Sequence, residues 1–165
     1  MTDHALFRKD FIVITGGPGA GKTTLLNELQ RSGYPYVPEV AREIIQAEMS
    51  SDGDALPWKN AIKYRDLMLD RSIESYHTAL SKRSGHTMFF DRGIPDTLAY
   101  SYLIHAPISE RQNPQFRSTD TTSKCLFCRL GKKSTKRTAK EYRILKRRWP
   151  RITFCLKRTS SWIMN

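Results

Sequence analysis

Two kinds of apolar pattern alternate along the first 111 residues of the chain. Strands are predicted at residues 11–14, 36–37 and 87–90. The first run and, after Thr87, the third are continuously apolar or aromatic, as is typical of strands covered on both faces of a parallel sheet, whereas residues 36–37 form a weaker strand between two prolines. Elsewhere apolar residues recur at three- and four-residue steps, which predicts helices over residues 23–30, 41–49, 58–81 and 97–105, with Asp96 as the cap of the last. The alternation predicts an α/β domain with a parallel sheet flanked by helices.

The pattern fades after residue 111, and the composition changes at the same place. Residues 1–111 contain 13 Lys or Arg and 14 Asp or Glu, whereas residues 112–165 contain 15 Lys or Arg, only 2 Asp or Glu and all three cysteines. The net charge of +12 therefore belongs to the C-terminal third. We predict a folded domain over residues 1–111 that is incomplete at its C-terminal end. A basic tail of low order follows over residues 112–165, in which residues 152–156 could form one strand.

A phosphate-binding loop follows the first predicted strand. Residues 16–23 fit the pattern G-x-x-x-x-G-K-[ST] at every position, between an apolar strand and a helix, which is the context that this motif requires. The glycines permit backbone angles that point successive N–H groups at an anion, and the N-terminus of the helix adds its positive end. Lys22 would reach the β- and γ-phosphates, and the Thr23 hydroxyl would bind Mg²⁺. The predicted nucleotide-binding residues are Gly16, Gly17, Pro18, Gly19, Ala20, Gly21, Lys22, Thr23 and Thr24.

Three further charged residues stand at the ends of predicted strands. Asp91 directly follows an apolar strand, where a Mg²⁺-organising carboxylate lies in P-loop enzymes, and Arg92 beside it could meet a phosphate or pair with an acid. Glu39 follows the second strand, where it could accept a proton from a substrate hydroxyl. The structural alternatives are that Asp91 closes a turn and that Glu39 caps the next helix. We predict Lys22, Asp91, Glu39 and Arg92 as catalytic residues, and Thr23 and Asp91 as metal ligands.

Together these strings resemble the NadR-type AAA domain family of small P-loop ATPases, which is related to nicotinamide-riboside kinase-like and nucleoside kinase-like proteins. The resemblance rests on residues 11–24, 37–45 and 90–96, in this order, and covers residues 1–111. It implies a kinase-like P-loop fold that binds ATP with Mg²⁺. By match of motif, Glu39 would be the base, and Asp91 and Arg92 would form the acid–arginine pair after the third strand. The resemblance leaves the phosphoryl acceptor open.

After residue 111 the chain departs from the family's pattern, because the expected lid, a strand ending in a Pro-Pro-Trp-like string and a last strand and helix are not present as written. Shifting the coding frame by one nucleotide over residues 128–138 permits Pro-Pro-Trp-Lys-Glu-Ile-Tyr-Gln-Thr-Asp, which resembles that continuation. We therefore hypothesise that residues 112–165 are a frameshifted segment.

The sequence thus predicts a P-loop protein that uses MgATP for hydrolysis or for phosphoryl transfer to a small molecule. One alternative is a nucleotide-binding regulatory module whose basic run at residues 140–151 contacts nucleic acid or acidic membrane. Another is a truncated, poorly active product of a frameshifted gene. If residues 112–165 are out of frame, the charge of this basic run is accidental, so nucleic acid is disfavoured as a partner. The absence of an 18-residue apolar run predicts a cytoplasmic protein without a membrane span.

Overall fold

The strands form a largely parallel sheet with β1 near its middle. The computed structural model describes residues 8–82, 87–107, 122–130, 152–158 and 161–164. Within these residues six strands form one sheet in the order β2-β3-β1-β4-β5-β6, in which only β5 and β6 are antiparallel. They are β1 (Arg8–Thr15), β2 (Tyr36–Val37), β3 (Met88–Asp91), β4 (Thr122–Leu130), β5 (Ile152–Arg158) and β6 (Ser161–Met164). The predicted α/β class with a parallel sheet is confirmed.

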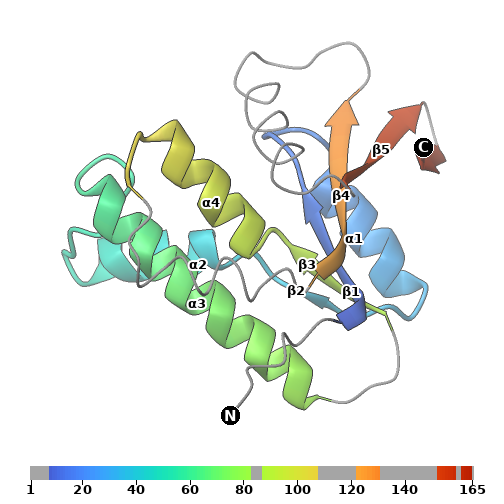
Figure 1. Cartoon of the computed structure of the whole chain (residues 1–165), viewed down its shortest axis with the longest axis horizontal. Coiled ribbons are helices and arrows are strands. Elements are labelled where there is room, and N and C mark those ends of the chain that lie inside the picture. The colour runs from blue at the N-terminus through green and yellow to red at the C-terminus, as the bar shows by residue number, and fades with distance from the viewer. Residues whose placement is uncertain (1–7, 83–86, 108–121, 131–151, 159–160, 165) are drawn as a thin grey trace.

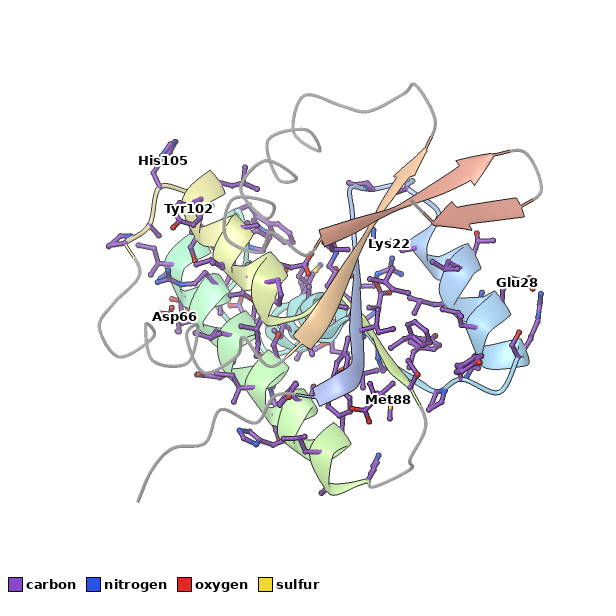
Figure 2. All side chains as sticks on the ribbon, turned by 45° about the vertical axis from the view of Figure 1, so that its right-hand side comes forward. Lys22, Glu28, Asp66, Met88, Tyr102 and His105 are labelled. Atoms are coloured by element: carbon purple, nitrogen blue, oxygen red, sulfur yellow. The ribbon has the colours of Figure 1, made fainter. Side chains whose placement is uncertain are left out.

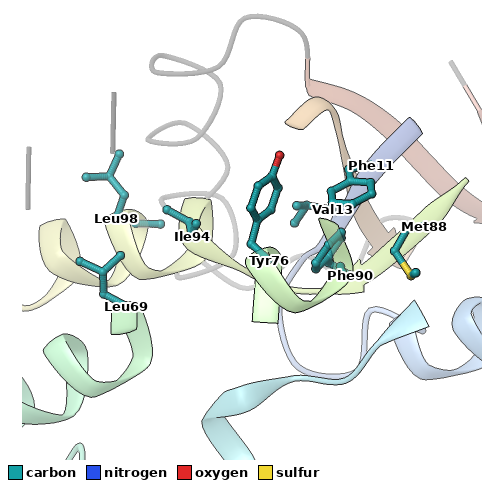
Figure 3. Close-up of a cluster of buried hydrophobic side chains, with 10 residues drawn as sticks. Phe11, Val13, Leu69, Tyr76, Met88, Phe90, Ile94 and Leu98 are labelled. Carbon is teal, nitrogen blue, oxygen red and sulfur yellow. The ribbon is translucent and has the colours of Figure 1, made fainter. Parts of the chain in front are cut away.

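Helices cover both faces of the sheet (Figure 1). They are α1 (Lys22–Arg31), α2 (Val40–Ser50), α3 (Ala61–Ser81) and α4 (Ile94–Leu103). Because successive strand residues point to opposite faces, β1 and β3 supply two cores. Ile14 and Phe89 pack against α1. Val13 and Phe90 belong to the other core, with residues of α3 and α4, and Figure 3 shows this cluster. In the described part of the chain, no helix is long and apolar enough to cross a membrane.

The start of α3 differs from the prediction, which placed it at residue 58. Asn60 caps the helix, because its side chain accepts a hydrogen bond from the backbone N–H of Lys63. Trp58 therefore stays in the preceding loop, with 63% of its surface exposed.

The start of α4 also differs, because the helix begins at Ile94 and includes Pro95 in its first turn. Proline is tolerated there, since the N–H groups of a first helical turn have no partner within the helix. Asp96 was predicted as the cap residue but lies inside this turn. Its carboxylate accepts a hydrogen bond of 3.1 Å from the N–H of Gly93, so it stabilises the helix start from within.

The C-terminal third contributes strands to the sheet, although we expected regular structure to end near residue 111. β4 runs parallel beside β1, with Val13 in register with Cys125, and β5 continues the sheet beyond β4. The strand predicted at residues 152–156 is confirmed as β5. Lys124 and Arg129 interrupt the apolar pattern of residues 122–130, which is why periodicity did not reveal β4. The basic run at residues 140–151 lies outside the described residues.

Candidate functional site

The phosphate-binding loop connects β1 to α1 and depends on glycine backbones. Gly16, Gly19 and Gly21 have φ angles of 140°, 72° and 83°, and Gly21 is the residue from which α1 starts. Figure 2 shows Lys22 at the N-terminal end of this helix. The Lys22 ammonium donates hydrogen bonds to the carbonyl oxygens of Gly16, at 2.8 Å, and Gly17, at 3.1 Å. The lysine is therefore folded back over the loop that would hold a phosphate.

Arg92 connects this loop to two carboxylates. Its Nη2 donates to the carbonyl oxygen of Gly16 at 2.8 Å, its Nη1 lies 2.8 Å from Asp96 Oδ1, and its Nε lies 2.9 Å from Glu39 Oε1. Its φ of 64° is left-handed, which is uncommon for a residue with a side chain. The side chains of Arg92, Glu39 and Asp96 are only 24%, 17% and 12% exposed, so water screens these contacts weakly. The guanidinium thus bridges the phosphate-binding loop and Glu39.

Asp91 ends β3 with a carboxylate oxygen that lacks a hydrogen bond. Its Oδ1 is buried and has no partner among the described residues. Burial, and then the nearby carboxylate of Glu39, raise the pKa of Asp91 above its ordinary value, against the charges of Lys22 and Arg92. A buried polar atom of this kind is unfavourable unless a ligand satisfies it.

The oxygen atoms of Asp91 and Thr23 fit Mg²⁺, which commonly takes one or two protein oxygens and completes its shell with water and phosphate oxygens. In the part of the chain that the structure describes, no three His, Cys, Asp or Glu side chains gather into a metal site. Mg²⁺ held jointly with a nucleotide does not require such a group. The residues present therefore suit the metal that the phosphate-binding loop implies.

The charges around Lys22 favour a bound anion. Burial lowers the pKa of Lys22 below its ordinary value, and the Arg92 guanidinium lowers it further. The carboxylates of Asp91, Asp96 and Glu39 act in the opposite direction. Two cations that repel each other beside an anion-binding loop would both gain from a phosphate between them.

A cavity of about 240 Å³ opens beside these charged groups. Glu39, Arg92 and Asp96 contribute to its lining, together with a wall from α3 and α4 that includes Tyr64, Met68 and Tyr100. The rings of Tyr64 and Tyr100 meet edge to face, with centroids 5.7 Å apart and planes at 83°. Burial raises the pKa of Tyr64 to about 12. A small molecule in this cavity would lie next to both Glu39 and Arg92.

The structure brings together the four predicted catalytic residues, Lys22, Glu39, Asp91 and Arg92. Their chemical roles stay predictions, as do those of Thr23 and Thr24, which are exposed in the first turn of α1. Asp96 belongs to the same cluster, although its position in the sequence predicted only a helix cap. Tyr64 and Tyr100 were not predicted at all, since no linear pattern shows that two helices will enclose a cavity between them.

The profile of the AAA domain family matches residues 11–157. The chain belongs to this family. The match confirms the resemblance predicted from three short strings, and it extends beyond residue 111, where the sequence departs from the family's expected pattern. No curated protein matches the sequence of this AAA domain.

Two solved structures of a NadR protein are similar to this AAA domain. One, in complex with NR, gives a TM-score of 0.65 at 20% sequence identity, over 90% of this chain and 44% of that one. The other, in complex with NAD and AMP-PNP, gives a TM-score of 0.55 at 21% sequence identity, again over 90% of this chain and 44% of that one. At such identities the likeness shows a common fold. The chain spans less than half the length of these NadR proteins.

Proposed function

We propose that this protein transfers the γ-phosphoryl group of MgATP to a hydroxyl of a small molecule bound in the cavity beside Glu39. The observation that carries the proposal is the position of Arg92. Its guanidinium contacts the phosphate-binding loop through the Gly16 carbonyl and the candidate base through Glu39 Oε1. The cavity that both Glu39 and Arg92 line has room for an acceptor. A cytoplasmic location, where MgATP is available, fits this reaction.

On the nucleotide side, the loop N–H groups and the positive end of α1 would hold the β- and γ-phosphates. Lys22 would exchange its two carbonyl partners for phosphate oxygens. Asp91 and Thr23 would hold Mg²⁺, which when bound neutralises charge on the transferring phosphoryl group. Because Arg92 lies at the junction of the two sites, it would turn from Glu39 toward the phosphoryl oxygens as charge develops there.

On the acceptor side, Glu39 would take the proton of the acceptor hydroxyl while that oxygen forms a bond to the γ-phosphorus. The bond from the γ-phosphorus to the bridging oxygen breaks, and ADP leaves. Glu39 and Asp96 carry two negative charges and Arg92 one positive charge, so the cavity favours neutral or cationic acceptors over phosphorylated ones. The aromatic wall suits an acceptor with a flat ring.

The decisive experiment measures ADP release and follows the phosphoryl group by ³¹P NMR, with and without an acceptor. Nicotinamide riboside is a suitable first probe, because one similar NadR structure is a complex with NR. The proposal predicts a new phosphomonoester signal that appears only with acceptor, and no signal with the Lys22→Met variant. Release of inorganic phosphate alone, at a rate that no acceptor in a panel of neutral and cationic alcohols changes, would show that the protein is an ATPase instead.

A further inference from the structure

Helices α3 and α4 together form the aromatic wall of the cavity, so the register between them decides which side chains face the acceptor. Tyr64 and Met68 come from α3, and Ala99 and Tyr100 come from α4. The rings of Tyr64 and Tyr100 meet across the interface between α3 and α4. A second contact crosses the same interface one residue further along each helix, where Arg65 Nη1 donates a hydrogen bond to the hydroxyl oxygen of Ser101 at 3.2 Å.

Arg65 is unusual because its guanidinium is almost completely buried. The residue is 3% exposed and Ser101 is 0% exposed. Its Nε donates to Asp66 Oδ1 at 2.6 Å, and its Nη1 also donates to the carbonyl oxygen of Pro107 at 3.2 Å. A buried guanidinium is tolerated only when its donors are satisfied, because removing the charge from water is unfavourable. Pro107 lies in the segment that follows α4, so Arg65 contacts both this helix and the segment after it.

Apolar packing already binds the two helices to the sheet and to each other. Leu69 and Leu98 are 1% and 2% exposed and belong to one core with residues of β1 and β3. Apolar contacts are non-directional and allow small sliding adjustments, whereas hydrogen bonds from a planar guanidinium require fixed directions. The contribution of Arg65 is therefore to fix the position of α4 along α3.

We propose that Arg65 is a positioning residue for the acceptor cavity, which holds Tyr64 and Tyr100 in their edge-to-face arrangement through its bonds to Ser101 and Pro107. Its influence on an acceptor rests on the proposed function, but its influence on the two rings does not. Changes at Arg65 or Ser101 alter the ring geometry and weaken acceptor binding. They leave nucleotide binding unchanged, because the phosphate-binding loop is on a different connection, between β1 and α1.

The test labels the protein with 3-fluorotyrosine and records ¹⁹F NMR spectra, assigning the resonances of Tyr64 and Tyr100 from their Phe variants. Ser101→Ala is the mild perturbation, because it removes one oxygen and no charge. Arg65→Lys keeps the positive charge but replaces the planar guanidinium, with its several N–H donors, by an ammonium group. The matched control is Arg71→Lys, since Arg71 lies on the same helix with its side chain 58% exposed. We expect Ser101→Ala and Arg65→Lys to shift both assigned resonances, and Arg71→Lys to shift neither.

Kinetics with nicotinamide riboside then separate positioning from general damage. In Ser101→Ala the KM for the acceptor should rise on the order of tenfold, with the ATP dissociation constant within about twofold of wild type. In a Tyr100→Ala background the same substitution should have little further effect on this KM, since the ring that it positions is gone.

Unchanged ¹⁹F shifts in both variants, or shifted resonances with an unchanged acceptor KM in an active enzyme, would overturn the proposal. Equal losses of ATP and acceptor affinity would do the same, because they indicate a merely structural role. Failure of the wild type to phosphorylate any acceptor contradicts the proposed function instead. The ¹⁹F spectra then decide on their own whether Arg65 positions the two rings.

Discussion

Replacing Lys22 by Met removes the ammonium group and keeps most of the side chain's length and packing. In the structure this ammonium holds two loop carbonyls, Gly16 at 2.8 Å and Gly17 at 3.1 Å, which it must release to bind a nucleotide. Two charged hydrogen bonds to phosphate contribute about 3–6 kcal/mol together, and giving up the two carbonyl bonds offsets roughly 1–3 kcal/mol of this. A net loss of about 2–3 kcal/mol corresponds to a roughly 30- to 150-fold weaker affinity for ATP.

Isothermal titration calorimetry with ATP, ADP and AMP in the presence of Mg²⁺ measures this loss. We expect Lys22→Met to weaken ATP and ADP binding strongly and AMP binding little, because the lysine reaches the β- and γ-phosphates. Lys59→Met is the control, since the Lys59 ammonium makes exposed contacts with Asp52 and Gly53, away from the phosphate-binding loop. Thermal unfolding of each variant confirms that the fold is retained. An unchanged ATP affinity in folded Lys22→Met, or an equal loss for AMP, would refute the assignment of the phosphate-binding loop.

Three other substitutions or deletions test the remaining parts of the site and fold. Glu39→Gln should lower kcat for phosphoryl transfer by about 10²–10⁴-fold with little change in ATP affinity, and an unchanged kcat would remove Glu39 as the base. Glu43→Gln is the control and should leave kcat unchanged, because Glu43 is exposed in the first turn of α2, the helix that begins directly after Glu39. Tyr64 is protonated in the folded state up to a pKa of about 12 but ionises near 10 when unfolded, so stability should fall between these pH values by at most about 2.7 kcal/mol. Tyr64→Phe should flatten this decline in urea unfolding curves at pH 9–12, and an identical decline in the variant would contradict the pKa shift. Deleting residues 112–165 removes β4, one of the two strands paired with β1, so the melting temperature should fall by several degrees or more; an unchanged melting temperature would show that the C-terminal third contributes nothing to the fold.

The first half of the sheet could be predicted because its strands are apolar on both faces. Residues 11–14 and 88–90 are continuously apolar or aromatic, and the structure places alternate residues of each run in separate cores. The phosphate-binding loop could be predicted because its residue types are required by backbone geometry. Only glycine adopts angles such as the φ of 83° at Gly21 without strain. Both features are local, so a single sequence contains them.

The rest of the site depends on contacts between distant segments. Asp96 and Arg92 are four residues apart, but Arg92 also reaches Gly16 and Glu39, which lie far away in the sequence. The periodicity of α3 and α4 predicts which helix faces are apolar. It does not predict where two apolar faces separate to leave a cavity, and the Tyr64–Tyr100 pair lies at such a place.

In the C-terminal third, the composition of the sequence supports one conclusion, and the family match and strand pairing support another. Its charge and cysteine content change abruptly at residue 112, which supports the hypothesis of a shifted coding frame. The family profile nevertheless continues to residue 157, and β4 takes the position beside β1 that would otherwise be an open edge of the sheet. An open edge next to the phosphate-binding loop is unfavourable, because its N–H and C=O groups lack partners. Backbone pairing of this kind requires only an extended segment of sufficient length, so it can occur with a poorly matched sequence. The coding DNA across residues 105–140 and the intact mass of the protein decide between the two origins of this segment. A single inserted or deleted nucleotide would establish the frameshift, whereas an intact reading frame and a matching mass would make β4 and β5 native strands of the family fold.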